Sequence, residues 1–369
     1  MRQAPRVQAV ILGAGASGIL HALALRAAGV RIAAVYDPDD ERARLLADTC
    51  GAGVVSSIAD AAAVDARIAA ICGPPSVHVE QAEILSAASS ERIVLVEKPV
   101  ATTRNELERI VRVPRCVPIL QWRSGRALRA LRRAIAHGEL GDAPAVSCDL
   151  AWSRDDDYFL ARRGWGCGAL LSIGIHAIDA IGWALGRAFE GAAGLGASTR
   201  LAGDEPITGE TSAVAVLRFA GGAMASLRLS LDGGADVTRV AMCGGGRSVV
   251  LEGGEADPTS MTLRWWARTT ADRERLEALE RDTAGALGAP LLVPYLGAVI
   301  GAIRDGEMPG DSQRLPAIAD TFGAHAAAMC IATPRSSGAQ TIPPAPDSSA
   351  GDAVEPEVRA GRPASPPCP

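Results

Sequence analysis

The chain has 369 residues, of which 48% are hydrophobic and 21% charged, and its formal net charge at pH 7 is −5. This composition is typical of globular proteins with ample apolar residues for a core, and the length predicts two domains. The negative charge, with arginines spread along the chain, argues against a nucleic-acid partner or an acidic membrane surface. No apolar run approaches the roughly 20 residues that span a bilayer.

The eight cysteines are scattered as single residues, without C-x-x-C pairs or the spacing of metal ligands. We therefore expect reduced thiols and no bound metal. The first residues lead directly into a predicted strand, which leaves no room for a signal peptide. Together these features predict a cytoplasmic protein.

The first 120 residues alternate short apolar runs with helical patterns. This alternation predicts an α/β fold with a parallel, doubly wound sheet and helices on both faces. The predicted strands are Val7–Leu12, Arg31–Tyr36, Ala66–Cys72, Ile93–Glu97 and Val117–Gln121. Helices are predicted to begin near Ser17, Asp40, Ser76 and Thr103.

A glycine-rich sequence, G-x-G-x-x-G, lies between the first strand and its helix. Gly13 permits a tight turn, Gly15 lets the backbone approach a pyrophosphate, and Gly18 lets the helix pack closely on the strand. The free N–H groups of the helix start, at Ala16 and Ser17, would hold the pyrophosphate. The other interpretation is a glycine-rich turn in an unrelated α/β domain.

An acidic residue, Asp37, ends the second strand, 19 residues after Gly18 and near the ~20-residue spacing of the dinucleotide fingerprint. Asp37 would accept hydrogen bonds from the hydroxyls of the adenosine ribose. A 2′-phosphate at this place would be repelled by Asp37 and by the neighbouring Asp39 and Asp40. The sequence therefore predicts NAD as the cofactor and disfavours NADP.

Two further segments follow apolar strands at the carboxyl edge, where open α/β sheets hold their ligands. The first contains Gly73, Pro74 and His78, and it is predicted either to form a wall beside the nicotinamide ribose or to be a plain strand-to-helix loop. The second contains Glu97 and Lys98. We expect both segments to contact the cofactor.

Lys98 is the only lysine of the chain, because every other Lys or Arg position is arginine. Arginine serves surface charge at least as well, whereas only an ammonium in a desolvated or cationic site gives up its proton near neutral pH. We therefore predict that Lys98 is catalytic. The other interpretation is a codon bias that spared one surface lysine.

Beyond Trp122 the alternation gives way to a run of strands separated by Gly-rich turns at 221–222, 233–234 and 244–246, as expected for antiparallel neighbours. The residues from 343 to 369 are rich in Pro, Ser, Ala, Gly and acids and predict a disordered tail. The predicted elements between these points are helix Gly125–Ala136, strand Ala145–Trp152, helix Ala169–Leu185, strands Ser212–Phe219, Ala223–Leu231, Thr238–Cys243, Ser248–Leu251 and Met261–Trp266, and helices Leu291–Arg304 and Arg314–Ile331.

The predicted helix Ala169–Leu185 carries a third group of polar residues. Ser172, His176 and Asp179 are spaced i, i+4 and i+7 and would share one helical face. His176, one of five histidines, is the best candidate for a general acid or base. A single histidine on a helix is more often structural, but the accompanying motifs favour catalysis. Ser172 would then hydrogen-bond a substrate hydroxyl, and Asp179 would either orient the imidazole or face the other domain.

Candidate substrate contacts lie on strand–loop segments that would roof the pocket. They combine arginine with aromatic side chains in a chain with only 4% aromatic residues, which suggests a polar, ring-shaped ligand, with an anion as one option. These residues are Arg123, Trp152, Arg154, Tyr158, Arg163 and Trp165, together with His176.

These motifs in this order resemble the Gfo/Idh/MocA family of oxidoreductases over roughly residues 7–335. The resemblance rests on Glu97-Lys98-Pro99 and on the helix with the family pattern G-G-x-L-x-D-x-G-x-H-x-x-D. It implies an N-terminal Rossmann domain (1–121) and a C-terminal α+β domain (122–335) with a large, mostly antiparallel open sheet that often mediates homo-oligomers, before the tail (336–369). The family's lysine maps to Lys98 and its histidine to His176.

The resemblance further implies NAD(P)-dependent oxidation or reduction at a secondary hydroxyl of a sugar, inositol or nucleotide sugar. His176 would take the hydroxyl proton while Lys98 stabilises the alkoxide, and the reverse assignment stays open. Ser172 stands where the family usually has an acid, and Cys167 replaces a glycine. Two alternatives are a non-catalytic nucleotide-binding regulatory or interaction protein and an NAD-dependent glycosidase.

Overall fold

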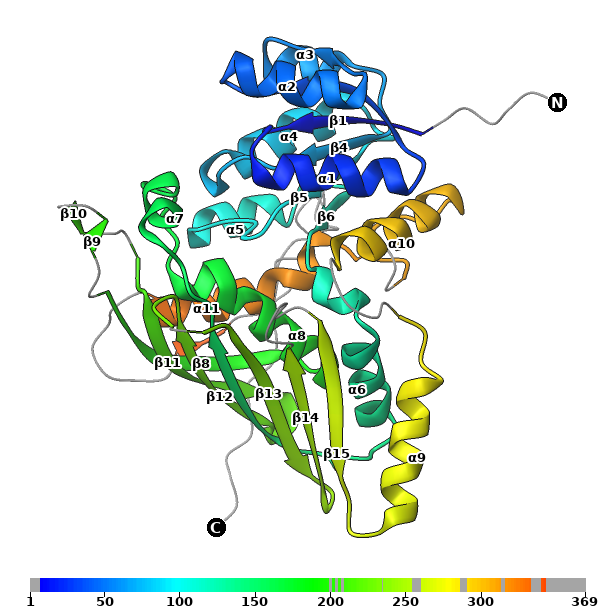
Figure 1. Cartoon of the computed structure of the whole chain (residues 1–369), viewed down its shortest axis with the longest axis vertical. Coiled ribbons are helices and arrows are strands. Elements are labelled where there is room, and N and C mark those ends of the chain that lie inside the picture. The colour runs from blue at the N-terminus through cyan, green and yellow to red at the C-terminus, as the bar shows by residue number, and fades with distance from the viewer. Residues whose placement is uncertain are drawn as a thin grey trace, which may run out of the picture.

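The computed structural model describes residues 7–198, 201–202, 205–206, 209–233, 235–253, 260–285, 291–312, 316–332 and 340–342. The chain builds two sheets that lie one above the other along the long axis of the molecule (Figure 1). None of the helices in these described ranges has the length and apolar character needed to cross a membrane.

The first sheet is parallel and has the strand order β3-β2-β1-β4-β5-β6. Its strands are β1 (Gln8–Leu12), β2 (Arg31–Tyr36), β3 (Gly53–Val54), β4 (Ile68–Ile71), β5 (Ile93–Val96) and β6 (Cys116–Pro118). Its helices are α1 (Ala16–Ala27), α2 (Asp40–Cys50), α3 (Ile58–Ala63), η1 (Pro75–Val77), α4 (His78–Ala88) and α5 (Arg104–Ile110). The predicted doubly wound sheet is confirmed, and its order reverses between β1 and β4, where such sheets bind ligands.

The strands of this sheet are continuous apolar runs because helices cover both of their faces. Every residue of β4 and β5 is fully buried. Side-chain caps fix the starts of the covering helices: Asp39 accepts from two N–H groups of α2, and Thr103 forms a capping box with Glu106 at α5. These local signals place the strand ends, and hence the site, at one edge.

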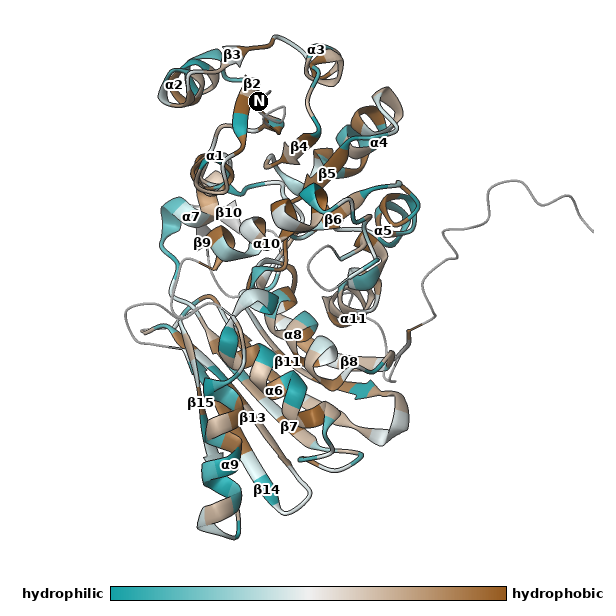
Figure 2. Ribbon diagram, turned by 90° about the vertical axis from the view of Figure 1, so that its right-hand side faces the viewer, coloured by the Kyte–Doolittle hydropathy of each residue, from teal (hydrophilic) through white to brown (hydrophobic). Residues whose placement is uncertain are grey.

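The second sheet has eight strands in the order β15-β14-β13-β7-β12-β11-β8-β16. Its strands are β7 (Ala145–Ala151), β8 (Phe189–Ala197), β11 (Ser212–Phe219), β12 (Met224–Ser230), β13 (Val237–Gly244), β14 (Arg247–Gly253), β15 (Met261–Trp266) and β16 (Gln340–Thr341), with β9 (Leu201–Ala202) and β10 (Glu205–Pro206) forming a separate pair. Buried and exposed residues alternate along β11 and β12, so one face is covered and the other is open (Figure 2).

Several helices complete this half of the molecule. They are η2 (Gln121–Ser124), α6 (Arg126–Ala136), α7 (Asp156–Ala161), the π-helical turn η3 (Leu170–Gly174), α8 (Ile175–Leu185), η4 (Ala220–Gly222), α9 (Thr270–Arg281), α10 (Leu292–Arg304), η5 (Ile318–Thr321) and α11 (Phe322–Ala332). Helix α10 packs against α1 of the first sheet although it comes late in the chain (Figure 1). Its apolar residues belong to the same core cluster as those of β1 and α1.

The structure corrects the expectation that the Gly-rich turns join antiparallel neighbours throughout. The turns at 221–222 and 244–246 do so, but the turn at 233–234, of which Gly234 lies outside the described residues, joins β12 to β13, and β7 lies between them. Strand β12 is parallel to β7, and β13 is antiparallel to it. Strand β7, which comes earlier in the chain, therefore lies in the sheet between β12 and β13. A turn sequence between β12 and β13 cannot predict this insertion.

Other differences have local causes. Strand β8 was not predicted because its sequence is rich in Gly and Ala and lacks the apolar pattern of a strand. The small residues allow close packing, since an added Cβ at Gly194 would lie 2.5 Å from the carbonyl oxygen of Val214 on the neighbouring strand. Helix α9 is mostly polar, and α7 is only six residues long, so neither gave a periodic apolar signal. The predicted tail begins at 336, yet β16 pairs with β8 and Ile342 is buried; residues 343–369 lie outside the described ranges.

Candidate active site

Two of the three fingerprint glycines occupy positions that only glycine fits, and the third leaves open space beside the loop. Gly13 has φ of +99°, and a Cβ there would lie 2.7 Å from the backbone nitrogen of Gly73. A Cβ on Gly18 would lie 1.9 Å from the carbonyl oxygen of Gly13, so only glycine allows α1 to approach β1. Above Gly15 no heavy atom lies within 4 Å, so the loop leaves open space beside its backbone.

Helix α1 begins at this loop without a side-chain cap. Gly15 is its N-cap residue, and its first turn carries no acidic side chain. The N–H groups at Ala16 and Ser17 are therefore left for another acceptor, and the helix dipole favours an anion there. The open space above Gly15 and this uncapped helix start fit a dinucleotide pyrophosphate.

Asp37 lies against the same loop. Its Oδ2 accepts a hydrogen bond of 2.6 Å from the N–H of Ala14, and its Oδ1 accepts one of 2.9 Å from Asp39. These bonds fix the carboxylate at the end of β2 while it remains partly exposed. The contact of Asp37 with the adenosine ribose stays a prediction.

Two predicted cofactor residues point into the protein instead. His78 is fully buried, and its ring nitrogens lie 3.0 Å from the carbonyl oxygens of Gly73 and Pro99. The Glu97 side chain, 13% exposed, has its Oε1 2.9 Å from Nε2 of the buried His21. Both were predicted to contact the cofactor, but each holds another part of the protein.

Lys98 links the two halves of the site. Its Nζ donates a hydrogen bond of 2.9 Å to the carbonyl oxygen of Ser172, which belongs to the π-helical turn η3. This bond brings together two motifs that lie 74 residues apart in the sequence. The π-helical turn was not predicted; such turns are rare and are often found at functional sites.

The start of the η3–α8 segment is set by Glu210. Its carboxylate accepts from the N–H of Leu170 at 2.8 Å, and its carbonyl accepts from Ala169 at 2.7 Å. An added Cβ at Gly168 would lie 2.4 Å from backbone atoms of Glu210, so only glycine fits before the turn. These contacts fix the entry into the helix that carries His176.

His176 is 3% exposed and stacks on Trp122, with ring centroids 5.5 Å apart and planes 13° from parallel. Trp152 covers another side at 6.4 Å. Burial, followed by the positive charge of Lys98, lowers the pKa of His176 to about 3. The imidazole is therefore neutral near pH 7, which is the form that accepts a proton. Its Nδ1 has no hydrogen-bond partner among the described residues.

Ser172 and Asp179, which were predicted to share a helical face with His176, behave differently. The buried hydroxyl of Ser172 has no hydrogen-bond partner within the described part of the chain. Asp179, predicted to orient the imidazole, is instead bound to Arg123 through both carboxylate oxygens, with Oδ2 2.9 Å from Nε. Arg123 was predicted to contact substrate, but it is 8% exposed and engaged in this pair.

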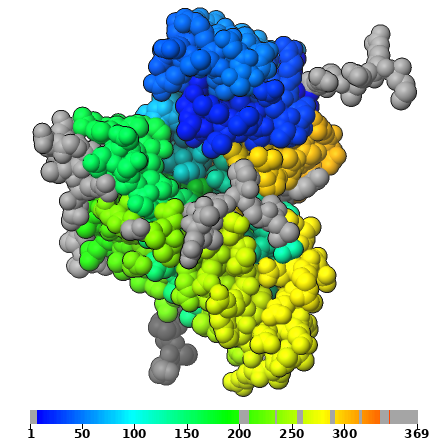
Figure 3. All heavy atoms as spheres, in the orientation of Figure 1, coloured from blue at the N-terminus to red at the C-terminus, as the bar shows by residue number. Residues whose placement is uncertain are grey.

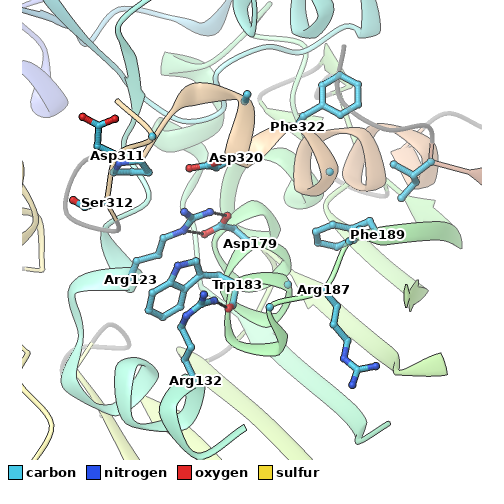
Figure 4. A pocket seen from close by; sticks show the side chains of 18 residues that line it. Arg123, Arg132, Asp179, Trp183, Arg187, Phe189, Asp311, Ser312, Asp320 and Phe322 are labelled. Carbon is cyan, nitrogen blue, oxygen red and sulfur yellow. Dashed lines mark hydrogen bonds and ion pairs between the residues drawn. The ribbon is translucent and has the colours of Figure 1, made fainter. Parts of the chain in front are cut away.

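The Arg123–Asp179 pair lines a cavity of about 650 Å³, together with residues of α8, β8 and η5. Figure 4 shows the guanidinium facing the carboxylate, with Trp183 and Arg132 beside them. Burial acts to lower the pKa of Arg123, and the adjacent Asp179 charge outweighs it, so that the pKa is raised. The guanidinium therefore keeps its charge in this buried place.

We expect Asp179→Asn to lower the free energy of unfolding by about 3 kcal/mol, because it leaves a buried guanidinium without its charge partner. Urea denaturation of the variant against the parent protein measures this. The control is the double variant Arg123→Met with Asp179→Leu, which removes both charges and should lose less. Equal losses in the single and double variants would show that the ion pair is not the cause.

Four of the five remaining predicted substrate residues form a ladder in which aromatic rings and guanidinium groups alternate. The guanidinium carbon Cζ of Arg154 lies 5.4 Å from the ring centre of Trp152 and 5.2 Å from that of Tyr158. Arg162, which was not predicted, stacks on Tyr158 at 3.7 Å and lies 5.1 Å from Trp165. The i, i+4 spacing of Arg154, Tyr158 and Arg162 was a signal for it. The predicted Arg163 is exposed beside the ladder.

The space-filling view shows the N-terminal unit seated on the C-terminal one, with α10 beside it (Figure 3). The glycine loop, Asp37 and the ends of β4 and β5 lie at the edge that meets the helix with His176, because Lys98 bonds across that boundary. This fold and site define an NAD-binding oxidoreductase.

Comparison with protein families assigns the same class. Residues 7–115 match the oxidoreductase family with the NAD-binding Rossmann fold, and residues 128–249 match the GFO/IDH/MocA C-terminal domain. The chain belongs to the GFO/IDH/MocA family, as its motifs predicted. Comparison with curated protein sequences gives no match.

Solved structures share this fold. The WlbA dehydrogenase from Bordetella pertussis, solved with NADH and UDP-GlcNAcA, is 22% identical with a TM-score of 0.73, over 88% of this chain and 95% of that one. An oxidoreductase domain protein from Kribbella flavida is 20% identical with a TM-score of 0.74, over 92% and 100%. A levoglucosan dehydrogenase, solved with NADH and levoglucosan, is 17% identical with a TM-score of 0.72, over 92% and 100%.

Proposed function

We propose that this NAD-dependent dehydrogenase acts on a secondary hydroxyl of a sugar, inositol or nucleotide sugar. The observation that carries the proposal is the hydrogen bond from Lys98 Nζ to the Ser172 carbonyl, one helical turn from the neutral imidazole of His176. This arrangement puts an ammonium and a base beside the edge that fits a dinucleotide.

NAD, when bound, supplies the acceptor for the hydride that leaves the carbinol carbon. The N–H groups of Ala16 and Ser17 would hold its pyrophosphate, and Asp37 its adenosine ribose. The chain's own part is proton chemistry. His176 takes the hydroxyl proton, and the ammonium of Lys98 donates to the oxygen as negative charge develops on it.

The lining of the site supports a polar, ring-shaped substrate. Trp122 and Trp152, both buried, pack against the ring of His176 and so fix the position of the base. Arg154 and Arg162, in the ladder that leads outward from Trp152, offer cations to an anionic or strongly polar extension. The WlbA structure contains UDP-GlcNAcA and another similar structure contains levoglucosan, so both charged and neutral sugars belong in the trial set.

A panel of inositols, sugars and nucleotide sugars with NAD⁺ tests the proposal by the absorbance of NADH. We expect one class to give net NADH in the wild type, and Lys98→Met to form NADH from it about 100-fold more slowly. A chromogenic glycoside tested in parallel separates a glycosidase, which would release the chromophore without net NADH. Binding of NAD without turnover on any secondary alcohol would contradict the proposed reaction.

We expect the protein to bind NAD at least tenfold more tightly than NADP, a difference of ~1.4 kcal/mol. The carboxylate of Asp37 accepts ribose hydroxyls but repels a 2′-phosphate. Asp37→Ser should narrow this preference, and adding Pro38→Arg should narrow it further. Asp39 is left intact because it caps α2. Fluorescence titration measures both affinities, and equal wild-type affinities would contradict the role of Asp37.

We also propose that the chain forms homo-oligomers through the open face of the second sheet, in a reducing, cytoplasmic compartment. That face carries exposed apolar side chains on three adjacent strands, among them Leu195, Val214, Val216 and Met224. The seven described cysteines are all free thiols, which supports the compartment. Sedimentation of the wild type against Val214→Lys with Val216→Lys tests the surface.

A further inference from the structure

Four of the five histidines lie around one short segment, residues 97–100, which contains the catalytic lysine. His176 stands beside Lys98 in the site, and the other three touch the segment itself from three different helices. These three are His21 on α1, His78 on α4 and His325 on α11, and each is fully buried. Sequence reasoning singled out His78 and His176 and missed the other two.

Two of the three histidines, His325 and His78, are neutral and hydrogen-bond to backbone atoms. His325 accepts the N–H of Val100 at Nε2, 3.1 Å away, so its Nδ1 carries the proton and faces Thr321. Burial lowers the pKa of His325 to about 4, which agrees with this neutral tautomer. Burial also lowers the pKa of His78, so its neutral ring donates to one of the carbonyls of Gly73 and Pro99.

His21 differs because its partner is a carboxylate. Its Nε2 lies 2.9 Å from Oε1 of Glu97. Burial acts to lower the pKa of His21, but the nearby Cys72 and Glu97 outweigh it and raise the pKa to about 10. Burial acts to raise the pKa of Glu97, but His21 and then Lys98 outweigh it and lower the pKa to about 2. The pair is therefore a buried imidazolium and carboxylate at neutral pH.

Glu97 contacts both His21 and Lys98. While its Oε1 faces His21, its Oε2 accepts the backbone N–H of Lys98 at 2.9 Å. One carboxylate thus joins a side chain of α1 to the backbone of Lys98. Because α1 is also the helix whose start fits the pyrophosphate, the contact joins the dinucleotide helix to the catalytic residue.

We propose that His21 is a positioning residue that acts through Glu97 to hold Lys98 at its bond with the Ser172 carbonyl. Without the imidazolium, Glu97 is left as a partly buried carboxylate with one unpaired oxygen. The nearest cation to which it can turn is the ammonium of Lys98, whose charge already acts on it. The ammonium of Lys98 then leaves the position from which it donates a hydrogen bond to the substrate oxygen. This inference rests on the proposed roles of Lys98 and His176.

The first test is a double-mutant cycle. We expect His21→Leu to lower kcat about 10²-fold, the scale of a displacement near 1 Å at a reacting group, with little change in KM or NAD affinity. In a Lys98→Met background the same change should cost nothing more, because His21 acts only through Lys98. His21→Gln, which keeps a donor near the position of Nε2, should recover part of the loss. His137→Gln, at the exposed histidine, is the matched control.

A second test does not depend on turnover. Lys98 is the only lysine, so reductive methylation with ¹³C-formaldehyde gives one lysine dimethylamine signal besides that of the N-terminus. We expect that signal to shift in His21→Leu, to return toward its wild-type position in His21→Gln, and to stay unchanged in His137→Gln. The thermal midpoint of each variant shows that the folded state is retained in the measurement.

The outcomes separate the two ideas. An unshifted signal in folded His21→Leu, or an additive loss of kcat in the Lys98→Met background, would overturn the positioning role. A shifted signal in a protein that turns over no secondary alcohol would retain the positioning of Lys98 and reject the proposed reaction. If His21→Leu does not fold, Glu97→Gln replaces it in the test. That variant removes the negative charge that faces His21, and it should shift the dimethylamine signal of Lys98.

Discussion

Replacing Lys98 with arginine is expected to lower kcat by about 100-fold or more while NAD binding survives nearly unchanged. The amine reaches the carbonyl of Ser172 from the end of β5. A guanidinium is larger and planar, and it cannot give up its proton at neutral pH. It would keep the charge but lose the position of the donor.

Stopped-flow measurement of NADH formation separates the chemical step from binding, and fluorescence titration measures NAD affinity. Arg92→Lys is the control, because it exchanges the two side chains in the reverse direction. The buried guanidinium of Arg92 donates to backbone carbonyls away from the site, so its loss should lower stability and leave turnover unchanged. Near-native turnover by Lys98→Arg would contradict the importance assigned to the single amine.

Replacing His176 with glutamine is expected to lower kcat by about 10²–10⁴-fold, the scale of losing a positioned general base. Glutamine retains the approximate volume against Trp122 but cannot accept a proton. Because burial and Lys98 lower the pKa of His176 to about 3, the base form is complete at neutral pH in the free protein. As the pH falls, activity is lost only when the imidazole becomes protonated near that value.

The pH profile of kcat/KM therefore should show no imidazole limb near 6.5, the ordinary histidine value. This profile is measured in the oxidation direction between pH 4.5 and 8 at constant ionic strength, with His137→Gln as control. An acid limb near 6.5 that disappears in His176→Gln would show that the imidazole is far more solvated than its stacked position implies. Unchanged turnover in the glutamine variant would assign the base to another group.

The sequence predicts best what is decided by neighbouring residues. Gly13, Gly18 and Asp37 are set by a strand, a tight turn and a helix within 30 residues, and the structure places them as those rules require. The meeting of Lys98 with the helix of Ser172 was implied by the family resemblance alone, because that helix follows no strand of the first sheet. The apolar strands β4 and β5 were equally clear. The two-residue β3 had no pattern to detect.

The side chains that were misplaced depend on partners far along the chain. Asp179 has the right spacing to orient His176, but its carboxylate is hydrogen-bonded to Arg123, 56 residues away in the sequence. Glu97 stands next to Lys98 in an edge motif, but His21, 76 residues away, turns it inward. A polar residue in a motif can face the ligand or a buried partner, and only the packed structure decides between the two. The π-helical turn at Ser172 is likewise invisible to a 3.6-residue pattern.

The late position of α10 has a consequence for synthesis. The first sheet is complete by residue 118, but the face of α1 remains uncovered until Leu292–Arg304 has been made. At ~5–20 residues per second, the ribosome takes tens of seconds or less to make the intervening chain, and during that time an apolar helix face stays exposed to chaperones and to other nascent chains. A truncated chain that stops after the first sheet would leave that apolar face of α1 exposed permanently, which favours aggregation.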